Sequence, residues 1–153
     1  MWIVPLVVAA DRITKVLAMG LEYRCRLVPG ILNVRYVENT GIAFSMFSGG
    51  GIGLVLFTFL LIAGLLVWLL VRPQEPKLLR WGLWLIVGGG LGNLYDRIVY
   101  GYVIDFLEFA FVRFAVFNVA DACICAGAAL AVLAMFIEEV RQKNHPKGNE
   151  NAE

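Results

Sequence analysis

One segment of the chain, from Gly51 to Val71, contains twenty-one consecutive residues without a charged side chain. As a helix it would be about 31 Å long, which matches the hydrocarbon thickness of a bilayer. A run of this length without a charge is typical of a membrane-spanning helix. We therefore expect the segment to cross a membrane and to end at Arg72, just before the prolines that follow.

Three further apolar segments indicate that the chain crosses the membrane more than once. The 153 residues are 60% hydrophobic and only 16% charged, which is more apolar surface than one soluble core can bury. We predict an all-α polytopic membrane protein in which residues 1–153 form a single domain with four transmembrane helices. The expected spans are residues 2–19, 51–71, 81–97 and 114–137.

The segments between the spans differ from them in composition. Residues 20–50 include a stretch from Ile31 to Val37 in which polar and apolar side chains alternate, as in a β-strand. Residues 98–113 form a second mixed loop. We expect both loops to form a small β-containing elaboration outside the cytoplasm. The polar residues 138–153 are expected to be a disordered cytoplasmic tail.

The distribution of basic residues predicts the orientation of the chain. Three basic residues fall within the nine positions from Arg72 to Arg80, between the second and third spans, and three more follow the fourth span. Short cytoplasmic loops carry an excess of lysine and arginine. We therefore expect both termini to be cytoplasmic and the elaborated loops to lie on the outer side.

Five carboxylates lie at or near the ends of the apolar segments, where a charge is costly unless it is paired or has a function. They are Asp11, Asp96, Asp105, Glu108 and Asp121. Two of them, Asp105 and Asp121, have apolar neighbours and no basic residue within four positions. Desolvation and mutual repulsion would let such a pair share one proton. These two acids are therefore candidates for acid–base chemistry.

Residue spacing places polar side chains in three clusters, one on each of three helices. Positions three and four apart share a helix face, as for Asp11, Thr14 and Lys15. The second cluster is Asn93, Asp96 and Arg97, and the third is Asn118 and Asp121. If the first and third helices run outward and the fourth runs inward, all three clusters lie at one level near the outer surface. Ion pairs are expected for Asp11 with Lys15 and for Asp96 with Arg97.

The remaining composition argues against several kinds of site. The only histidine, His145, lies in the polar tail, which disfavours Ser-His, Cys-His and His-containing zinc sites. The glycine run from Gly88 to Gly92 lies inside a span without a phosphate-binding lysine, so close helix packing is its expected role. The basic residues are scattered, so no nucleic acid is expected, and no metal or cofactor is predicted. The surviving chemistry is a pair of aspartates that activates water and protonates a leaving amine.

Five short motifs occur in order along the chain up to about Ile137. They are Asp11-Arg-Ile-Thr-Lys15, Asn39-Thr-Gly-Ile-Ala43-Phe44, Gly92-Asn93-Leu-Tyr-Asp96-Arg97, Val103-Ile-Asp105-Phe106 and Phe117-Asn118-Val-Ala120-Asp121. Read together, they resemble the bacterial lipoprotein signal peptidases (signal peptidase II). The four expected spans agree with the layout of that family.

The resemblance implies a metal-free aspartic endopeptidase of the bacterial cytoplasmic (inner) membrane. Such an enzyme cuts diacylglyceryl-modified prolipoproteins just before the lipidated cysteine, and the resemblance places the catalytic pair at Asp105 and Asp121. It places substrate-contacting, inhibitor-contacting or supporting residues at Asp11, Lys15, Asn39, Gly41, Asn93, Arg97 and Asn118. The implied partners are a lipidated precursor, membrane lipids and the inhibitor globomycin. We expect a monomer without a cofactor.

Two positions depart from the pattern of that family. Arg12 stands where the family often has glutamine, which adds a charge beside Asp11, and Ile42 stands where a small residue is commoner. An alternative function from another class is a small proton- or ion-coupled transporter subunit that uses the same acids as a relay. A relay requires a polar path across the bilayer, and the second span offers only Thr58 to it.

Overall fold

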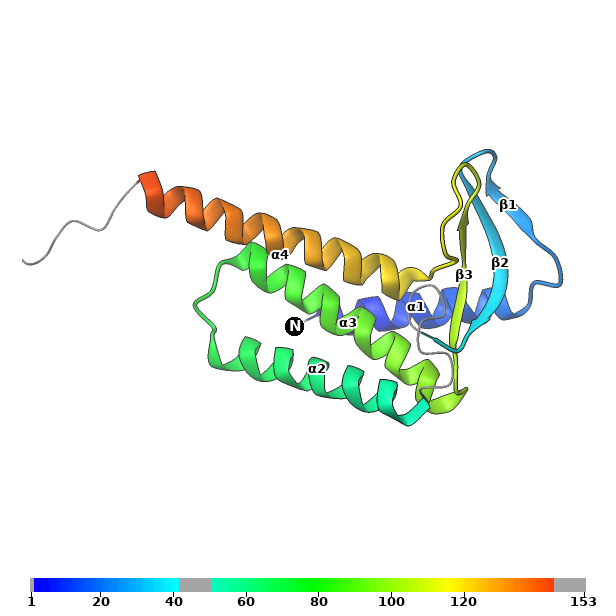
Figure 1. Cartoon of the computed structure of the whole chain (residues 1–153), viewed down its shortest axis with the longest axis horizontal. Coiled ribbons are helices and arrows are strands. Elements are labelled where there is room, and N and C mark those ends of the chain that lie inside the picture. Colours follow the sequence, from blue (N-terminus) through cyan, green and yellow to red (C-terminus); the bar gives the residue numbers. More distant parts are fainter. Residues whose placement is uncertain (1, 42–50, 145–153) are drawn as a thin grey trace, which may run out of the picture.

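The computed structural model describes residues 2–41 and 51–144, which form four helices and a three-stranded sheet. The elements are α1 (Ile3–Met19), β1 (Cys25–Val28), β2 (Leu32–Asn39), α2 (Gly51–Val71), α3 (Lys77–Val99), β3 (Val103–Phe109) and α4 (Val119–Asn144). Figure 1 shows the helices packed roughly side by side, with the sheet lying across one end of the bundle. The sheet therefore lies beside the last turns of α1 and α3 and the first turn of α4.

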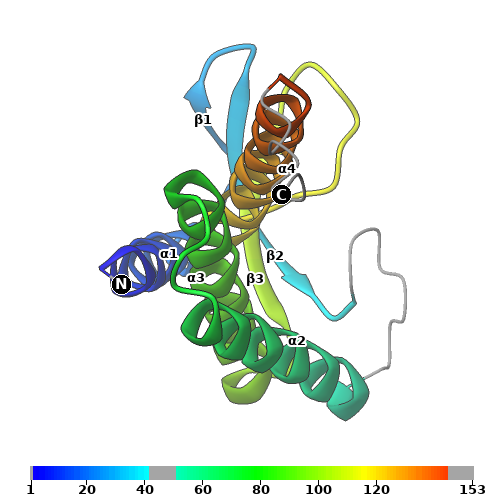
Figure 2. The same cartoon turned by 90° about the vertical axis from the view of Figure 1, so that its left-hand side faces the viewer.

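Helix α3 occupies the centre of the bundle and contacts each of the other three helices (Figure 2). Its consecutive glycines, residues 88–90, explain how this is possible. A Cβ atom would meet Val7 of α1 at the first glycine, the backbone of Ala120 of α4 at the second, and Ile62 of α2 at the third. The predicted packing role of this glycine run is confirmed, because the missing side chains let three helices approach one backbone.

The sheet is antiparallel, with the strand order β1-β2-β3. In the pairing of β2 with β3, Val37 lies opposite Asp105 and Asn39 lies opposite Val103. Because side chains alternate between the two faces of a strand, Asn39 and Asp105 project from the same face as diagonal neighbours. The strand predicted from the alternating pattern in residues 31–37 is confirmed as β2. The register of β2 against β3 brings the Asn39 side-chain amide next to the Asp105 carboxylate.

The fourth helix begins at Val119, whereas the sequence predicts a span from residue 114. The residues before it are held by β3 instead. Phe117 exchanges backbone hydrogen bonds with Leu107, at N···O distances of 2.8 and 2.9 Å. Apolar side chains at 114–117 look like helix in sequence, but pairing with a distant strand decides their conformation. This pairing also carries the start of α4 next to β3.

The prediction that the tail is disordered is wrong for residues 138–144. Helix α4 continues through Asn144, and Lys143 lies 2.7 Å from Glu139 one turn earlier, an ion pair that supports an exposed helix. Residues 145–153, which make up the rest of the predicted tail, lie outside the described residues.

The third helix begins earlier than the sequence predicts, at Lys77 and not at residue 81. Pro76 precedes it in an extended conformation, which is a common way to start a helix after a proline. Its first turn contains Arg80, whose guanidinium donates to the carbonyls of Leu69 (3.5 Å) and Arg72 (3.1 Å). These carbonyls belong to the last turn of α2 and the residue after it, where helix acceptors lack partners. Arg80 therefore joins the end of α2 to the start of α3.

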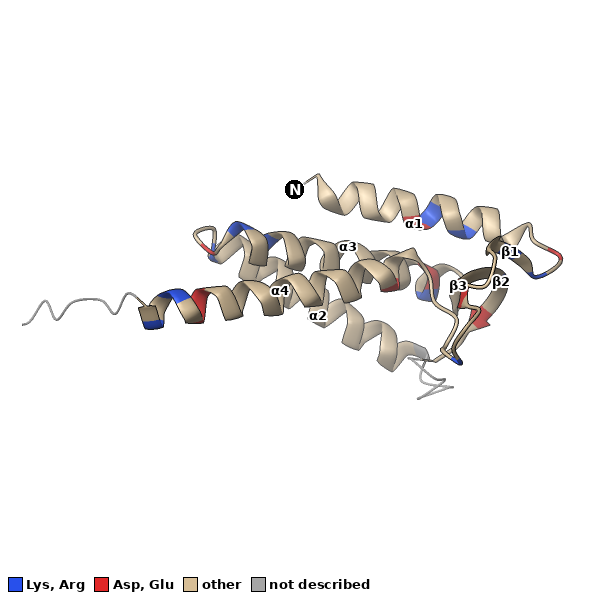
Figure 3. Cartoon of the chain, turned by 90° about the horizontal axis from the view of Figure 1, so that it is seen from above, with Lys and Arg blue, Asp and Glu red and all other residues tan. Residues whose placement is uncertain are grey.

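Among the described residues, two helices are long and apolar enough to cross a membrane, namely 52–71 and 119–144. Helices α1 and α3 do not meet this combined requirement of length and composition, so their predicted crossing stays a prediction. Figure 3 shows lysine and arginine around the connection from α2 to α3 and at the end of α4, and also on α1 and beside the sheet. Charged residues of α1 lie toward the sheet.

Candidate active site

Asp105 lies in β3 and is almost completely buried. Its carboxylate oxygens accept hydrogen bonds from Asn39 Nδ2 (2.8 Å to Oδ2) and Asn118 Nδ2 (2.7 Å to Oδ1). The Asn39 amide can present Nδ2 because its Oδ1 accepts the Gly41 N–H at 3.0 Å. Both oxygens of this acid therefore face amide donors, and no described cation lies within ion-pair distance of it.

Asp121 occupies the third position of α4, where it forms a capping box with Asn118. The Asp121 N–H donates to Asn118 Oδ1 at 2.8 Å, and the Asn118 N–H donates back to Asp121 Oδ2 at 3.2 Å. This reciprocal pairing satisfies backbone donors that a helix start leaves free. The other carboxylate oxygen, Oδ1, accepts from Asn93 Nδ2 at 2.7 Å. Helix capping thus fixes the carboxylate in place.

Asn118 connects the two aspartates. Its side-chain amide donates to Asp105, and its backbone N–H and side-chain oxygen pair with Asp121. Burial raises the pKa of Asp105 to about 6, and the nearby charge of Asp121 adds to this effect, while the amides of Asn39 and Asn118 oppose it. An acid held in this way can carry a proton close to neutral pH.

A buried cluster of ions lies behind the two aspartates, between α1 and α3. Lys15 Nζ lies 2.8 Å from Asp11 Oδ2 and 2.7 Å from Asp96 Oδ2, and all three side chains are fully buried. Arg12 Nη2 lies 2.5 Å from Asp96 Oδ1 and 3.7 Å from Asp11 Oδ2. The predicted pair of Asp11 with Lys15 is confirmed. Two acids and two bases balance in formal charge, as buried ions require.

The predicted ion pair of Asp96 with Arg97 is wrong. Consecutive helix residues point about 100° apart, so they do not face each other. Asp96 points instead to the two basic residues of α1. Arg97 donates to the carbonyls of Asn93 (3.4 Å) and Gly41 (3.3 Å).

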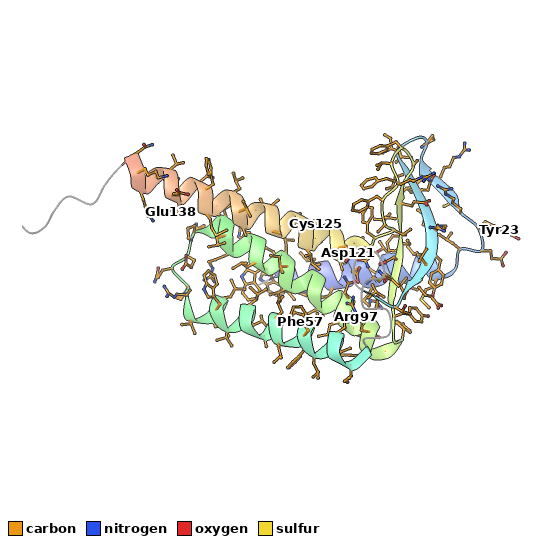
Figure 4. All side chains as sticks on the ribbon, in the orientation of Figure 1. Tyr23, Phe57, Arg97, Asp121, Cys125 and Glu138 are labelled. Carbon is orange, nitrogen blue, oxygen red and sulfur yellow. The ribbon has the colours of Figure 1, made fainter. Side chains whose placement is uncertain are left out.

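A cavity of about 630 Å³ opens beside both aspartates. Its polar side is formed by amides, acids and one guanidinium, and its apolar side by an aromatic wall and by α4. The lining residues are Asn39, Gly41, Thr58, Gly90, Asn93, Arg97, Val103, Asp105, Phe109, Phe114, Ala115, Val116, Phe117, Asp121, Ala122, Ile124 and Cys125. Figure 4 shows Arg97 and Asp121 near the sheet and Cys125 further along α4. The cavity places two carboxylates and an apolar surface in one space.

No three His, Cys, Asp or Glu side chains in residues 2–41 and 51–144 gather closely enough to hold a metal ion. A second cavity, of about 290 Å³, shares Asn39 and Arg97 as part of its lining.

The expected proximity of the three polar clusters is confirmed. Hydrogen bonds and ion pairs, together with the cavity, bring together Asp11, Lys15, Asn39, Gly41, Asn93, Arg97, Asp105, Asn118 and Asp121. Thr14 is the exception, because its hydroxyl bonds the carbonyls of Ala10 and Asp11 in its own helix. The pairing of Arg12 with Asp96 was missed, since nothing in the sequence relates positions on different helices. Ile42 lies outside the described residues.

Comparison with known proteins gives a consistent result. The sequence profile of the family described as Signal peptidase (SPase) II matches residues 3–137. A lipoprotein signal peptidase from Shewanella sediminis is 40% identical over an alignment of 159 residues, which covers 98% of this chain and 90% of that protein. One from Thermosynechococcus vestitus is 36% identical over 132 residues, covering 82% and 84% of the two chains.

Two solved structures, each described as a bacterial membrane enzyme, share the fold. One has a TM-score of 0.83 at 24% identity and covers 99% of this chain and 93% of that one. The other has a TM-score of 0.80 at 27% identity and covers 88% and 90%. The arrangement of four helices with a small sheet across one end therefore recurs in these enzymes.

Proposed function

The chain belongs to the signal peptidase II family, and from this membership we propose that it cleaves diacylglyceryl-modified prolipoproteins just before the lipidated cysteine, with Asp105 and Asp121 as the catalytic pair. Membership makes the chain a membrane peptidase that removes signal peptides from lipoprotein precursors. The aspartic mechanism, the residues that perform it and the topology are the parts that we add.

The arrangement of the two aspartates carries the proposal. They come from β3 and α4, they line one cavity, and a single asparagine, Asn118, hydrogen-bonds both. Their carboxylates accept only N–H donors from amides in the part of the chain that the structure describes. Two acids without cation partners in a shared, partly apolar space favour a state in which the pair holds one proton.

In the proposed reaction, the ionised acid of the pair takes a proton from a water molecule. The water oxygen then attacks the carbonyl carbon of the peptide bond before the lipidated cysteine. The second acid donates its proton to the leaving nitrogen as the C–N bond breaks. The products are the signal peptide, which ends in a carboxylic acid, and a lipoprotein with a free amino group on its cysteine. The raised pKa of Asp105, about 6, lets this carboxyl group keep its proton to a higher pH than an ordinary aspartate does.

The cavity also fits a substrate that is already in the membrane. Its apolar side runs from Phe109, Phe114 and Phe117 to Ala122 and Ile124 on α4. An acylated peptide could therefore place its chains along α4 while its peptide bond reaches the acids. In this proposal the membrane lipids are partners, globomycin inhibits the reaction, and the enzyme acts as a monomer.

We place all four helices across the inner membrane, with the aspartates near the outer face and both termini in the cytoplasm. The basic residues at the far end of the bundle support this orientation (Figure 3). The charged residues of α1 are paired within the buried ion cluster. This pairing lowers the free-energy cost of placing α1 in the membrane.

The transporter alternative finds less support. Residues 3–10 of α1, 81–95 of α3 and 122–137 of α4 contain no charged side chain, and α2 contains only Thr58 as a polar side chain. A relay of ionisable groups across the bilayer therefore lacks members over most of its depth. The acids instead gather where the helices meet the sheet.

Cleavage by the purified chain in lipid vesicles tests the proposal. A prolipoprotein that carries diacylglycerol on its cysteine should be cut before that cysteine, and globomycin should stop the reaction. The matched substrate without the lipid should be cut much more slowly. Equal cleavage of both substrates, or cleavage at another bond, would show that the assigned substrate is wrong.

A further inference from the structure

Two buried acids each hold the backbone amide of the residue just before a catalytic aspartate. Asp96 Oδ2 accepts the Ile104 N–H at 3.1 Å, next to Asp105 in β3. Asp11 Oδ1 accepts the Ala120 N–H at 3.0 Å, and Ala120 directly precedes the other aspartate in α4. The backbone position of each catalytic aspartate is thereby tied to a side chain on α1 or α3.

One ammonium group joins these two acids. Lys15 Nζ lies 2.8 Å from Asp11 and 2.7 Å from Asp96, and it donates its third hydrogen bond to Asn93 Oδ1 at 3.0 Å. An ammonium group can only donate, so the Asn93 atom that faces it must be the oxygen. The nitrogen of that amide is then directed to Asp121. The lysine therefore links both acids and orients the amide that holds the aspartate of α4.

Arg12 supplies the second positive charge of this cluster. Its guanidinium pairs with Asp96 and lies 4.8 Å from the centre of the Tyr95 ring, a favourable position for a cation. With Arg12 present, the cluster separates into two neutral pairs, Asp11 with Lys15 and Asp96 with Arg12. We call these four side chains the amide clamp. None of the four lines the cavity that holds the aspartates.

We propose that the amide clamp positions the two catalytic aspartates relative to each other by holding the backbone amides that precede them. This inference rests on the proposed function of the aspartate pair. The clamp residues do not line the cavity, so they act on the pair and not on the substrate: Asp11 and Asp96 act through backbone amides, and Lys15 acts through these two acids and Asn93. Reactions that depend on two aligned groups are sensitive to position, and a displacement of about 1 Å can cost about 100-fold in rate.

The two neutral pairs allow each arm of the clamp to be tested without leaving a buried charge unbalanced. In the first arm, Asp11→Asn with Lys15→Met keeps an oxygen for the Ala120 amide, whereas Asp11→Leu with Lys15→Met removes it. In the second arm, Asp96→Asn or Asp96→Leu is combined with Arg12→Met. Within each arm the two variants have the same formal charge and differ by one side-chain amide, whose oxygen can accept the backbone N–H.

We expect the leucine variant of each arm to have a kcat about 100-fold below that of its asparagine partner, with KM values within about threefold. A role in folding alone would lower the amount of folded enzyme in the leucine variants and leave kcat per folded enzyme equal. Equal kcat values within either arm, measured per folded enzyme, would overturn the proposal.

If the leucine variants do not fold, a measurement on the unmodified enzyme tests whether the clamp makes its two hydrogen bonds to the backbone. Nuclear magnetic resonance of the labelled protein in lipid nanodiscs should detect coupling across two hydrogen bonds, from the Ile104 amide to the Asp96 carboxyl carbon and from the Ala120 amide to the Asp11 carboxyl carbon. The absence of either coupling would overturn the proposal. Because this experiment requires no turnover, it separates a failed clamp from a failed peptidase assignment.

Discussion

Asn93 Nδ2 donates a hydrogen bond of 2.7 Å to Oδ1 of Asp121, which joins the middle of the bundle to the first turn of α4. The oxygen of the same amide accepts from Lys15 (3.0 Å) and from Asn118 (3.1 Å). A single side chain on α3 thus contacts α1 and the start of α4 beside the proposed catalytic pair. Its amide makes hydrogen bonds to three other side chains, so an apolar replacement must leave at least one buried group without this partner.

Replacing Asn93 should therefore damage both stability and catalysis. Asn93→Leu leaves a buried ammonium and a carboxylate short of one hydrogen bond each, at a cost of about 1–3 kcal/mol for each unsatisfied group. We expect a lower thermal midpoint and a kcat reduced by at least about 10-fold, measured by thermal unfolding and by cleavage of a lipidated precursor.

Thr14→Val serves as the matched control for this change. The Thr14 hydroxyl bonds only carbonyls of its own helix, including that of Ala10, and lies outside the cavity lining. Its removal should change kcat by less than about twofold, since no group of the site loses a partner. A similar loss of activity in both variants would contradict the special place given to Asn93.

The raised pKa of Asp105 predicts a pH dependence. The proton on a carboxyl group with a pKa of about 6 is held below that pH and lost above it. If the reaction requires that proton, kcat/KM should fall as the pH rises through about 6. Asn39→Leu removes a hydrogen bond that lowers this pKa, so the descending limb should move to higher pH. An unchanged limb in the variant would argue against Asp105 as a proton-carrying member of the pair.

Much of the fold could be predicted from the sequence, where local signals dominate. The boundaries of α2 follow from an uninterrupted apolar run, those of α1 follow from a weaker apolar run that contains charged residues, and the strand β2 follows from alternation in residues 31–37. The start of α4 could not be predicted, because Phe117 pairs with Leu107 in a strand ten residues away. The tail was mistaken for disorder because its polar composition does not distinguish an exposed helix from a flexible chain.

The sequence predicts which polar clusters come together at the site, but it does not predict all of the individual contacts between their side chains. Spacing along each helix placed the polar clusters at one level, and the helix directions then brought them together. The partners of Asp96 were not predictable in this way, because Arg12 and Lys15 come from another helix. Local reasoning chose Arg97, the neighbour in sequence, although helix geometry turns that side chain away.

The packing of α3 against α4 predicts an effect of adding a single methyl group. A Cβ atom at Gly89 would overlap the backbone carbonyl of Ala120, which directly precedes Asp121 of the proposed pair. Gly89→Ala should therefore lower the thermal midpoint and reduce kcat, because α4 must shift to make room. Gly64→Ala on α2 has open space at its Cβ and should leave both quantities unchanged or raise stability slightly. If the two variants behave alike in thermal unfolding, the close helix contact is not as described.

The catalytic pair itself is tested most directly by Asp105→Asn and Asp121→Asn in lipid vesicles, with cleavage of a lipidated precursor as the readout. Glu108→Gln is the control, because Glu108 lies on the same strand as Asp105 but pairs with Arg24 and Arg35 away from the cavity. We predict that each asparagine variant folds at normal abundance and loses cleavage by at least about 10³-fold, while the control keeps wild-type turnover. Substantial turnover by either folded asparagine variant would contradict the assignment of the pair.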